Sequence, residues 1–384
     1  MYSENFALYL QRKITQTIAR ARNKYYKLKQ IRQIWVTDMN SNKKSKVLLI
    51  YTGGTIGMGR SSQTGALEPL DFNHLGELMP ELKDVDADID IYQFTPPIDS
   101  SDMNPQNWAQ LVHIISSNYP THDGFVILHG TDTMAYTASA LSFMLENLTK
   151  PVILTGSQLP MGLLRTDGKE NVLTSIEIAS ARRLDGTPEV PEVCIYFSQK
   201  LIRGNRAIKI AADGFNAFNS YNYPSLCEAG VNFSFHRHHI LRPDYSKPMI
   251  PHFRMDANVV VFSLFPGIEE SVMRHILDHP QLKGIVMRSF GSGNAPHMQW
   301  ILRLLREASS RGVTIVNVSQ CVSGRVEMGR YDTGYQLQHA GVISGFDSTV
   351  EAAITKLMYL QARYTDSHMV RIMMSHSIAG EITT

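Results

Sequence analysis

Two short segments that combine threonine with glycine follow directly on runs of apolar residues. The first, Tyr51–Gly57, reads YTGGTIG, and the second, Val126–Thr133, reads VILHGTDT. Thr55 and Thr131 are candidate nucleophiles, because the branched side chain of threonine restricts χ1 and aims the hydroxyl at a lower entropic cost than serine. Such a nucleophile also needs a base, a charge that holds the base in its state, and donors for the developing oxyanion. The alternatives are structural: a tight turn in the first segment, and a helix cap formed by Thr131 and Asp132 in the second.

Lys209 is the most suggestive candidate for the base. A lysine amine accepts a proton only when it is neutral, which requires burial, and Lys209 lies in the largely apolar run Ala207–Ala212. The alternative is a strand lysine whose amine points into water. Two further polar segments, Asp99–Asp102 and Thr155–Gln158, bring carboxylates and hydroxyls to the expected carboxyl ends of strands, where parallel sheets gather their ligands.

The apolar runs alternate with helical patterns, which favours a mostly parallel sheet covered by helices. In the first part of the chain we expect strands at 45–52, 124–128, 152–154 and 193–197 and helices at 105–116, 133–148 and 168–181. In the last part we expect strands at 259–264, 284–288 and 313–318 and helices at 269–277, 299–310, 349–364 and 367–375. The predicted fold is α/β, with a larger N-terminal catalytic domain (45–235), a proline-punctuated linker (236–256) and a smaller C-terminal domain (257–384).

The N-terminal residues are strongly basic. Residues 1–38 hold eight basic and two acidic side chains, whereas the rest of the chain holds 29 and 33. The body therefore has no basic excess, which disfavours nucleic-acid binding. Apolar residues at steps of three and four from Leu10 to Leu28 predict a basic amphipathic helix within an extension over residues 1–44. The alternative is a disordered extension, which translation from Met39 would largely omit.

Cysteine, histidine and hydropathy patterns indicate a cytoplasmic protein without a metal. Cys194, Cys227 and Cys321 are too few and too scattered for a disulfide framework, which fits a reducing compartment. The histidines between 236 and 239 lack the helical spacing of metal ligands, so we expect no metal. The longest apolar runs fall far short of the ~20 residues that cross a bilayer, so we expect no transmembrane segment.

Five motifs together resemble the bacterial cytoplasmic L-asparaginases. They are Tyr51–Gly57, Asp99–Met103 (DSSDM), Val126–Thr133, Arg203–Arg206 (RGNR) with Lys209, and Arg288–Pro296 (RSFGSGNAP). The resemblance covers about residues 46–384. It implies hydrolysis of L-asparagine to L-aspartate and ammonia through an acyl-enzyme on threonine, without metal or cofactor. It also implies a flavodoxin-like C-terminal domain and a homo-oligomer, either dimer or tetramer.

The resemblance assigns roles to individual residues. Thr55 becomes the primary nucleophile, and Thr131, Asp132 and Lys209 form a second catalytic group in which Lys209 is the base. Asp132 also recognises the substrate ammonium, and Thr131 orients water or assists proton transfer. The implied substrate-binding residues are Asp99, Ser100, Ser101, Gly130 and Ser157.

The sequence also departs from the pattern of these enzymes. Many relatives carry a tyrosine on the mobile loop after the first motif, but Gly57–Leu70 contains none, and Tyr331 is a candidate substitute. The polar loop Gly59–Gly65 is suited to act as a lid. A candidate effector site for asparagine maps onto Arg288, Asn294 and Cys321.

Two alternatives to a dedicated asparaginase remain open. One is a catalytically weak amino-acid sensor that keeps the pocket, and the other is an asparaginase with glutaminase side activity. A subunit for transfer-RNA amidation is disfavoured, because it needs a large appended domain.

Overall fold

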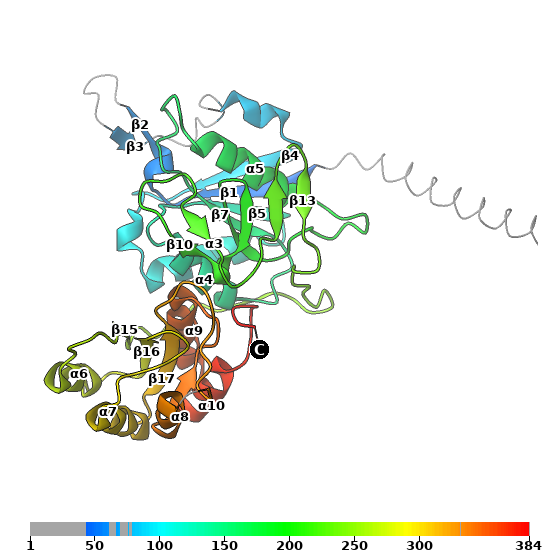
Figure 1. Ribbon diagram of the computed structural model, residues 1–384. Coiled ribbons are helices and arrows are strands. Elements are labelled where there is room, and N and C mark those ends of the chain that lie inside the picture. The colour runs from blue at the N-terminus through cyan, green and yellow to red at the C-terminus, as the bar shows by residue number, and fades with distance from the viewer. Residues whose placement is uncertain (1–43, 61–66, 70–75, 77–78, 331, 384) are drawn as a thin grey trace, which may run out of the picture. The chain divides into compact units, whose positions relative to one another are not determined.

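The computed structural model describes residues 44–60, 67–69, 76, 79–330 and 332–383. Nearly all of the predicted N-terminal extension therefore lies outside the described residues. The main sheet consists of β1 (Ser45–Tyr51), β4 (Ala87–Gln93), β5 (Gly124–Leu128), β7 (Val152–Thr155), β8 (Val193–Phe197), β9 (Lys200–Arg203), β12 (Cys227–Ala229) and β13 (Phe233–Phe235). Its strand order is β13-β12-β9-β8-β7-β5-β1-β4. Figure 1 labels β1, β4, β5, β7 and β13 of this sheet. The strands from β8 to β4 are parallel, and β9, β12 and β13 are added antiparallel at the other edge.

Helices cover both faces of this sheet, which is why its central strands are apolar on both faces. They are α3 (Pro105–Asn118), α4 (Met134–Met144) and α5 (Gly168–Ser180). Leu48 and Ile50 of β1 pack into the core that contains residues of α3 and α4. Val47 and Leu49 point the opposite way, into the core that contains residues of α5. The period of two along a strand thus divides one apolar run between two cores.

A second, smaller sheet follows in the chain. It contains β15 (Val259–Ser263), β16 (Gly284–Ser289), β17 (Thr314–Ser319) and β18 (Val342–Ser344), in that order and all parallel. Its helices are α6 (Glu270–Leu277), α7 (Gln299–Ser310), α8 (Asp332–His339), α9 (Val350–Arg363) and α10 (Ser367–Met374). α9 packs on this sheet and also contacts α4, so one continuous core joins the two sheets (Figure 1). Within the described residues, no helix has the length and apolar character needed to span a bilayer.

Three short strand pairs lie outside the two sheets. They are β2 (Met58–Arg60) with β3 (Leu67–Pro69), β6 (Leu145–Glu146) with β14 (Ile250–Pro251), and β10 (Ile208–Lys209) with β11 (Phe218–Asn219). The last pair carries Lys209, the predicted base, on only two residues of strand.

The structure confirms the predicted α/β fold class, and nearly every expected strand and helix ends within two residues of its predicted bounds. One helix was predicted too long: α4 ends at Met144, where the chain turns into β6 and pairs with β14 from the predicted linker. The sequence patterns missed β4, because it is an edge strand in which apolar residues alternate with the acidic Asp88 and Asp90. The domain boundaries themselves stay predictions.

Candidate active site

The strand order of the main sheet places three predicted motifs side by side. β1 lies between β4 and β5, so the chain leaves β1 for one neighbour and later returns on its other side. Such a reversal opens a crevice at the carboxyl ends of the strands, which is where ligands bind in open α/β sheets. The segments that follow these strands are Thr52–Thr55, Asp99–Asp102 and His129–Thr133.

Glycines allow these segments to touch through their backbones. A Cβ added to Gly54 would lie 2.5 Å from the Cα and N atoms of Gly130, and Gly54 has a φ of 89°. A Cβ on Gly130 would lie 2.5 Å from Oγ of Ser100, and a Cβ on Gly53 would lie 2.1 Å from the carbonyl oxygen of Ile98. Any side chain at these positions would push the segments apart. The residues that follow Gly54 and Gly130 are the two candidate threonines.

Lys209 contacts both of its predicted partners. Its Nζ donates to Oγ1 of Thr131 at 2.9 Å and to Oδ1 of Asp132 at 2.6 Å. The Lys209 side chain is 19% exposed and that of Asp132 is 66% exposed, so the pair borders solvent. The alternative reading as a helix cap does not hold, because Thr133 is the N-cap residue of α4 and no side-chain capping bond is present there. The lysine is only partly removed from water, which is less burial than its apolar neighbours suggested.

Thr55 is exposed at the start of the 3-10 helix η1 (Thr55–Gly57). This helix rests on Tyr51, whose hydroxyl donates to the carbonyl oxygen of Gly57 at 3.4 Å. A Cβ on Gly57 would lie 2.1 Å from that hydroxyl oxygen, so only glycine lets the ring pack there. Burial raises the pKa of Tyr51 to about 12, which keeps the hydroxyl protonated and able to donate. Tyr51 thereby supports the turn that presents Thr55.

The acidic segment forms the 3-10 helix η4 (Ser100–Asp102), which Asp99 caps. Oδ1 of Asp99 accepts hydrogen bonds from the backbone N and the Oγ of Ser101, each at 2.9 Å. These bonds lower the pKa of Asp99, so its carboxylate is ionised at neutral pH. Ser100 is buried, and its carbonyl oxygen accepts a hydrogen bond from Oγ1 of Thr133 at 2.6 Å. Asp99 is therefore an exposed anion that directly precedes Ser100, whose side chain lies against Gly130.

The segment after β7 adjoins Thr131. Ser157 is buried, and its Oγ donates to a backbone carbonyl two residues later at 2.5 Å. Oε1 of Gln158 accepts a long hydrogen bond of 3.5 Å from Oγ1 of Thr131. Its Nε2 donates to the carbonyl oxygens of Ala212 and Gly214, at 3.1 and 3.0 Å. Gln158 thus connects Thr131 with the stretch of chain just beyond Lys209.

A buried hydrogen-bonded chain lies behind Gly130. Nδ1 of His129 is 2.7 Å from the carbonyl oxygen of Gly130, and its Nε2 is 2.9 Å from Oγ1 of Thr137. Trp108 Nε1 donates to the same hydroxyl at 3.0 Å. Burial lowers the pKa of His129 to about 4, so the ring is neutral at physiological pH. Since a carbonyl can only accept, the ring proton sits on Nδ1, and Thr137 donates to Nε2.

The remaining predicted residues lie elsewhere. Arg288 is near the end of β16, Asn294 follows that strand and Cys321 follows the neighbouring β17. All three therefore lie near the carboxyl ends of the strands of the smaller sheet. Oδ1 of Asn294 accepts a hydrogen bond from Thr333 at 3.0 Å, and the Cys321 side chain is exposed. Tyr331 and most of the predicted lid loop, from residue 61 on, lie outside the described residues. In the described part of the chain, no group of three His, Cys, Asp or Glu side chains could hold a metal ion.

Two family models match this chain. "Asparaginase, N-terminal" matches residues 46–241, and "Glutaminase/Asparaginase C-terminal domain" matches residues 258–374. The chain belongs to the asparaginase family. Membership confirms the family that the five motifs predicted, and with it the predicted enzyme class, an amidohydrolase of the asparaginase type.

The alignments with named relatives cover nearly the full length of each relative. The chain is 45% identical to L-asparaginase 1 of Escherichia coli (strain K12) over 348 residues, which is 89% of this chain and 99% of that protein. The crystal structure of L-asparaginase I from Vibrio cholerae superposes with a TM-score of 0.81 at 41% identity, covering 89% of this chain and 100% of that one. The thermostable L-asparaginase from Thermococcus kodakarensis gives a TM-score of 0.80 at 32% identity, covering 88% and 99%.

Sequence reasoning missed several residues that shape this asparaginase-family site. Tyr51 and His129 lie inside the motifs that carry the resemblance, and Gln158 directly follows the predicted substrate-binding residue Ser157. Their contacts run through the backbone or behind the crevice, and residue type alone gives no signal for that. Asp167 is further removed: its carboxylate accepts from the backbone N atoms of Gln158 and Leu159, which only the folded chain brings near it.

Proposed function

We propose that this chain hydrolyses L-asparagine to L-aspartate and ammonia through an acyl-enzyme formed on Thr55. The observation that carries the proposal is the contact of Lys209 Nζ with both Thr131 and Asp132, in a crevice where the turn bearing Thr55 touches Gly130. A hydroxyl, an amine and a carboxylate in contact make up a group that can move protons for an adjacent nucleophile. Relatives named L-asparaginase that align along nearly their full length support the choice of substrate.

The reaction proceeds in two balanced steps. In the first, Thr55 Oγ1 attacks the side-chain amide carbon, and the proton it loses reaches the departing nitrogen, which leaves as ammonia. In the second, water attacks the ester, aspartate leaves, and a proton returns to Thr55. Lys209 and Asp132 exchange these protons through Thr131, which also orients the water. Holding nucleophile and proton-transfer group on adjoining backbones supplies the orientation that makes each step effectively unimolecular.

Recognition of the zwitterionic substrate falls to the segments around the crevice. The ionised carboxylates of Asp99 and Asp132 suit the α-ammonium, and the hydroxyls of Ser100 and Ser101 suit the α-carboxylate. The backbone of Gly130 and the side chain of Ser157 complete the pocket near the scissile amide. Because these groups surround a charged amino acid closely, they favour a small substrate over an extended peptide.

Several further features belong to the same proposal. Tyr331 assists Thr55 in place of the tyrosine that the first loop lacks, and Arg288, Asn294 and Cys321 form an effector site. The enzyme works without metal or cofactor, as a homodimer or homotetramer in the cytoplasm, a compartment that suits its three free cysteines.

Ammonia release from L-asparagine and L-glutamine by the purified chain tests the proposal. The wild type is expected to release ammonia from asparagine, and Thr55→Ala to lower kcat roughly 10⁴-fold because the nucleophile is gone. Thr187→Ala is the matched control, since Thr187 follows the exposed turn at residues 184–186 and its hydroxyl contacts only the Asp185 side chain. Binding of asparagine without turnover would support the sensor instead. Full activity of Thr55→Ala would show that Thr55 is not the nucleophile.

A further inference from the structure

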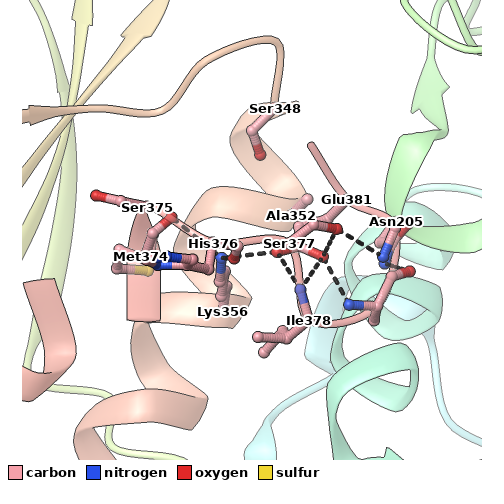
Figure 2. A network of polar contacts seen from close by, with 12 residues as sticks. Asn205, Ser348, Ala352, Lys356, Met374, Ser375, His376, Ser377, Ile378 and Glu381 are labelled. Carbon is pink, nitrogen blue, oxygen red and sulfur yellow. Dashed lines mark hydrogen bonds and ion pairs between the residues drawn. The ribbon is translucent and has the colours of Figure 1, made fainter. Parts of the chain in front are cut away.

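A buried ion pair shapes the C-terminal segment Ser375–Thr383. Glu381 is fully buried, and its Oε1 lies 2.6 Å from Nζ of Lys356 in α9. The carboxylate also accepts from the backbone N atoms of Ile378, at 3.1 Å, and Ala379, at 2.8 Å. Lys356 donates in addition to the backbone carbonyls of Met374, the last residue of α10, and of His376 in the segment, at 3.1 and 2.6 Å (Figure 2). Every polar atom of this pair is used to fold one short piece of chain.

The folded segment then presents its carbonyl groups to the 3-10 helix η5 (Gly204–Arg206). Nδ2 of Asn205 donates to the carbonyl oxygen of Ala379 at 2.8 Å, and Nε of Arg206 donates to that of Gly380 at 2.7 Å (Figure 2 shows Asn205 beside the segment). Gly380 has a φ of 78°, and a Cβ on it would lie 2.6 Å from Nη1 of Arg203. The segment thus approaches η5 as closely as its backbone permits.

Arg206 makes a second set of contacts that holds the end of the chain. Its Nη1 donates to Oδ2 of Asp347 at 2.9 Å and its Nη2 to Oγ1 of Thr383 at 3.1 Å. The other oxygen of Asp347 accepts from the backbone N of Thr383 at 2.7 Å. Because Arg206 is buried, these bonds exchange little with water, and they fix the position of its backbone.

The turn held in this way leads directly to Lys209. Only Ala207 and Ile208 separate Arg206 from Lys209, and β10 pairs through two residues with β11 alone. Such a short pair gives its residues little rigidity of their own. η5 also packs on α4 and β8: a Cβ on Gly204 would lie 2.9 Å from Cβ of Ala138 in α4 and 3.0 Å from the carbonyl oxygen of Val193 in β8. α4 begins just after Thr131 and Asp132. η5 therefore lies between α4 and the C-terminal segment.

We propose that the C-terminal segment Ser375–Thr383 is a positioning element for Lys209, holding η5 so that the lysine amine meets Thr131 and Asp132. The inference rests on the proposed function, since it takes Lys209 to handle protons in the reaction. Glu381, Asn205 and Arg206 act through Lys209 and do not touch the substrate. The chemistry of the N-terminal sheet therefore depends on the last residues of the chain.

Steady-state kinetics with Glu381→Gln tests this proposal. The amide places an N–H group where the carboxylate accepts backbone N–H bonds, so the segment loosens while its size is kept. We expect kcat per folded enzyme to fall about tenfold and KM to change less than twofold, since a small misplacement of a catalytic group costs rate. Asn205→Ala removes one neutral hydrogen bond to the segment and gives a smaller loss of the same kind. Glu307→Gln, which changes two exposed ion pairs, with Arg274 of α6 and Arg303 of α7, is the control and keeps wild-type kcat.

A double-mutant cycle with Lys209→Met separates positioning from general stability. In the Lys209→Met background, Glu381→Gln is expected to lower the residual rate less than twofold, because the group that it positions is already absent. Losses that multiply, or an unchanged kcat for the folded Glu381→Gln and Asn205→Ala variants, would overturn the positioning role. A Lys209→Met enzyme with wild-type kcat would instead overturn the proposed function, so the two failures are distinguishable.

Discussion

Two lysine–carboxylate pairs in this protein have the same length and opposite surroundings. Lys209 and Asp132 are 2.6 Å apart at the crevice, with side chains 19% and 66% exposed. Lys356 and Glu381 are also 2.6 Å apart, with side chains 2% and 0% exposed. Lys356 donates to Glu381 and to two backbone carbonyls, whereas Lys209 donates to the hydroxyl of Thr131, which borders solvent. A buried, fully partnered pair can only stabilise structure, and an open pair can also exchange protons with a substrate.

This contrast assigns different costs to the loss of each lysine. At the open pair, solvent already weakens the Coulomb interaction, so the pair contributes little to folding. At the buried pair, removal of one partner leaves an uncompensated charge in the core. The same substitution should therefore lower the reaction rate at one site and the free energy of unfolding at the other.

The largest effect is expected for Lys209→Met. With the proton-transfer group broken, kcat for asparagine should fall roughly 10³- to 10⁴-fold, which is about 4 to 5 kcal/mol of activation free energy. The free energy of unfolding should change by less than about 1 kcal/mol, because the pair is solvent-exposed. Ammonia release and chemical denaturation on the same preparation measure both quantities. A stable variant with unchanged kcat would show that Lys209 has no role in the reaction.

Lys356→Met should show the reverse pattern. Glu381 would keep its buried charge without its partner, and the free energy of unfolding should fall by roughly 4 kcal/mol. Denaturant titrations of the variant and wild type at neutral pH give this difference. Lys283→Met is a matched control, because the Lys283 side chain in its ion pair with Asp256 is largely exposed, and it should cost less than about 1 kcal/mol. Equal losses for the two variants would contradict the distinction between buried and exposed pairs.

A smaller effect concerns the buried histidine behind the crevice. Burial holds the pKa of His129 at about 4, below its ordinary value of 6.5, so the unfolded chain takes up this proton first as the pH falls. The contribution of His129 to the free energy of unfolding is present in full above pH 6.5 and is lost as the pH falls toward 4. This loss amounts to up to about 3 kcal/mol. His129→Gln should therefore lose less stability than wild type between pH 7 and pH 4.5, as measured by denaturant titration. An identical pH dependence would contradict this, because it would show that His129 takes up its proton as readily in the folded chain as in the unfolded one.

Local patterns were enough to predict most of the fold and to predict which polar segments follow its strands. The apolar runs before Thr55, Thr131 and Ser157 marked strand ends, and parallel strands bring such ends to one edge of a sheet. Strand order could not be predicted, so the close approach of Gly54 to Gly130 followed only from the structure. Lys209 illustrates the limit best: an apolar neighbourhood in sequence suggested full burial, but the side chain on this two-residue strand is 19% exposed.

Nothing in the sequence indicated that the C-terminal segment contacts η5. The motif RGNR is part of the resemblance to the family, but nothing in it indicates which residues its side chains contact. In the structure they contact Gly380 and Asp347, more than a hundred residues away in the sequence. Glu381 and Lys356 are ordinary charged residues in the sequence, and nothing local indicates that both are buried. Contacts of this range depend on how the two sheets pack, which hydrophobic periodicity does not determine.

Mass spectrometry of the enzyme quenched in acid during turnover of L-asparagine tests the central claim most directly. The proposal predicts a β-aspartyl ester on the peptide that contains Thr55, and no such ester in Thr55→Ala. An ester found on Thr131 instead, or ammonia release by an enzyme that forms no ester at any point of the time course, would contradict it.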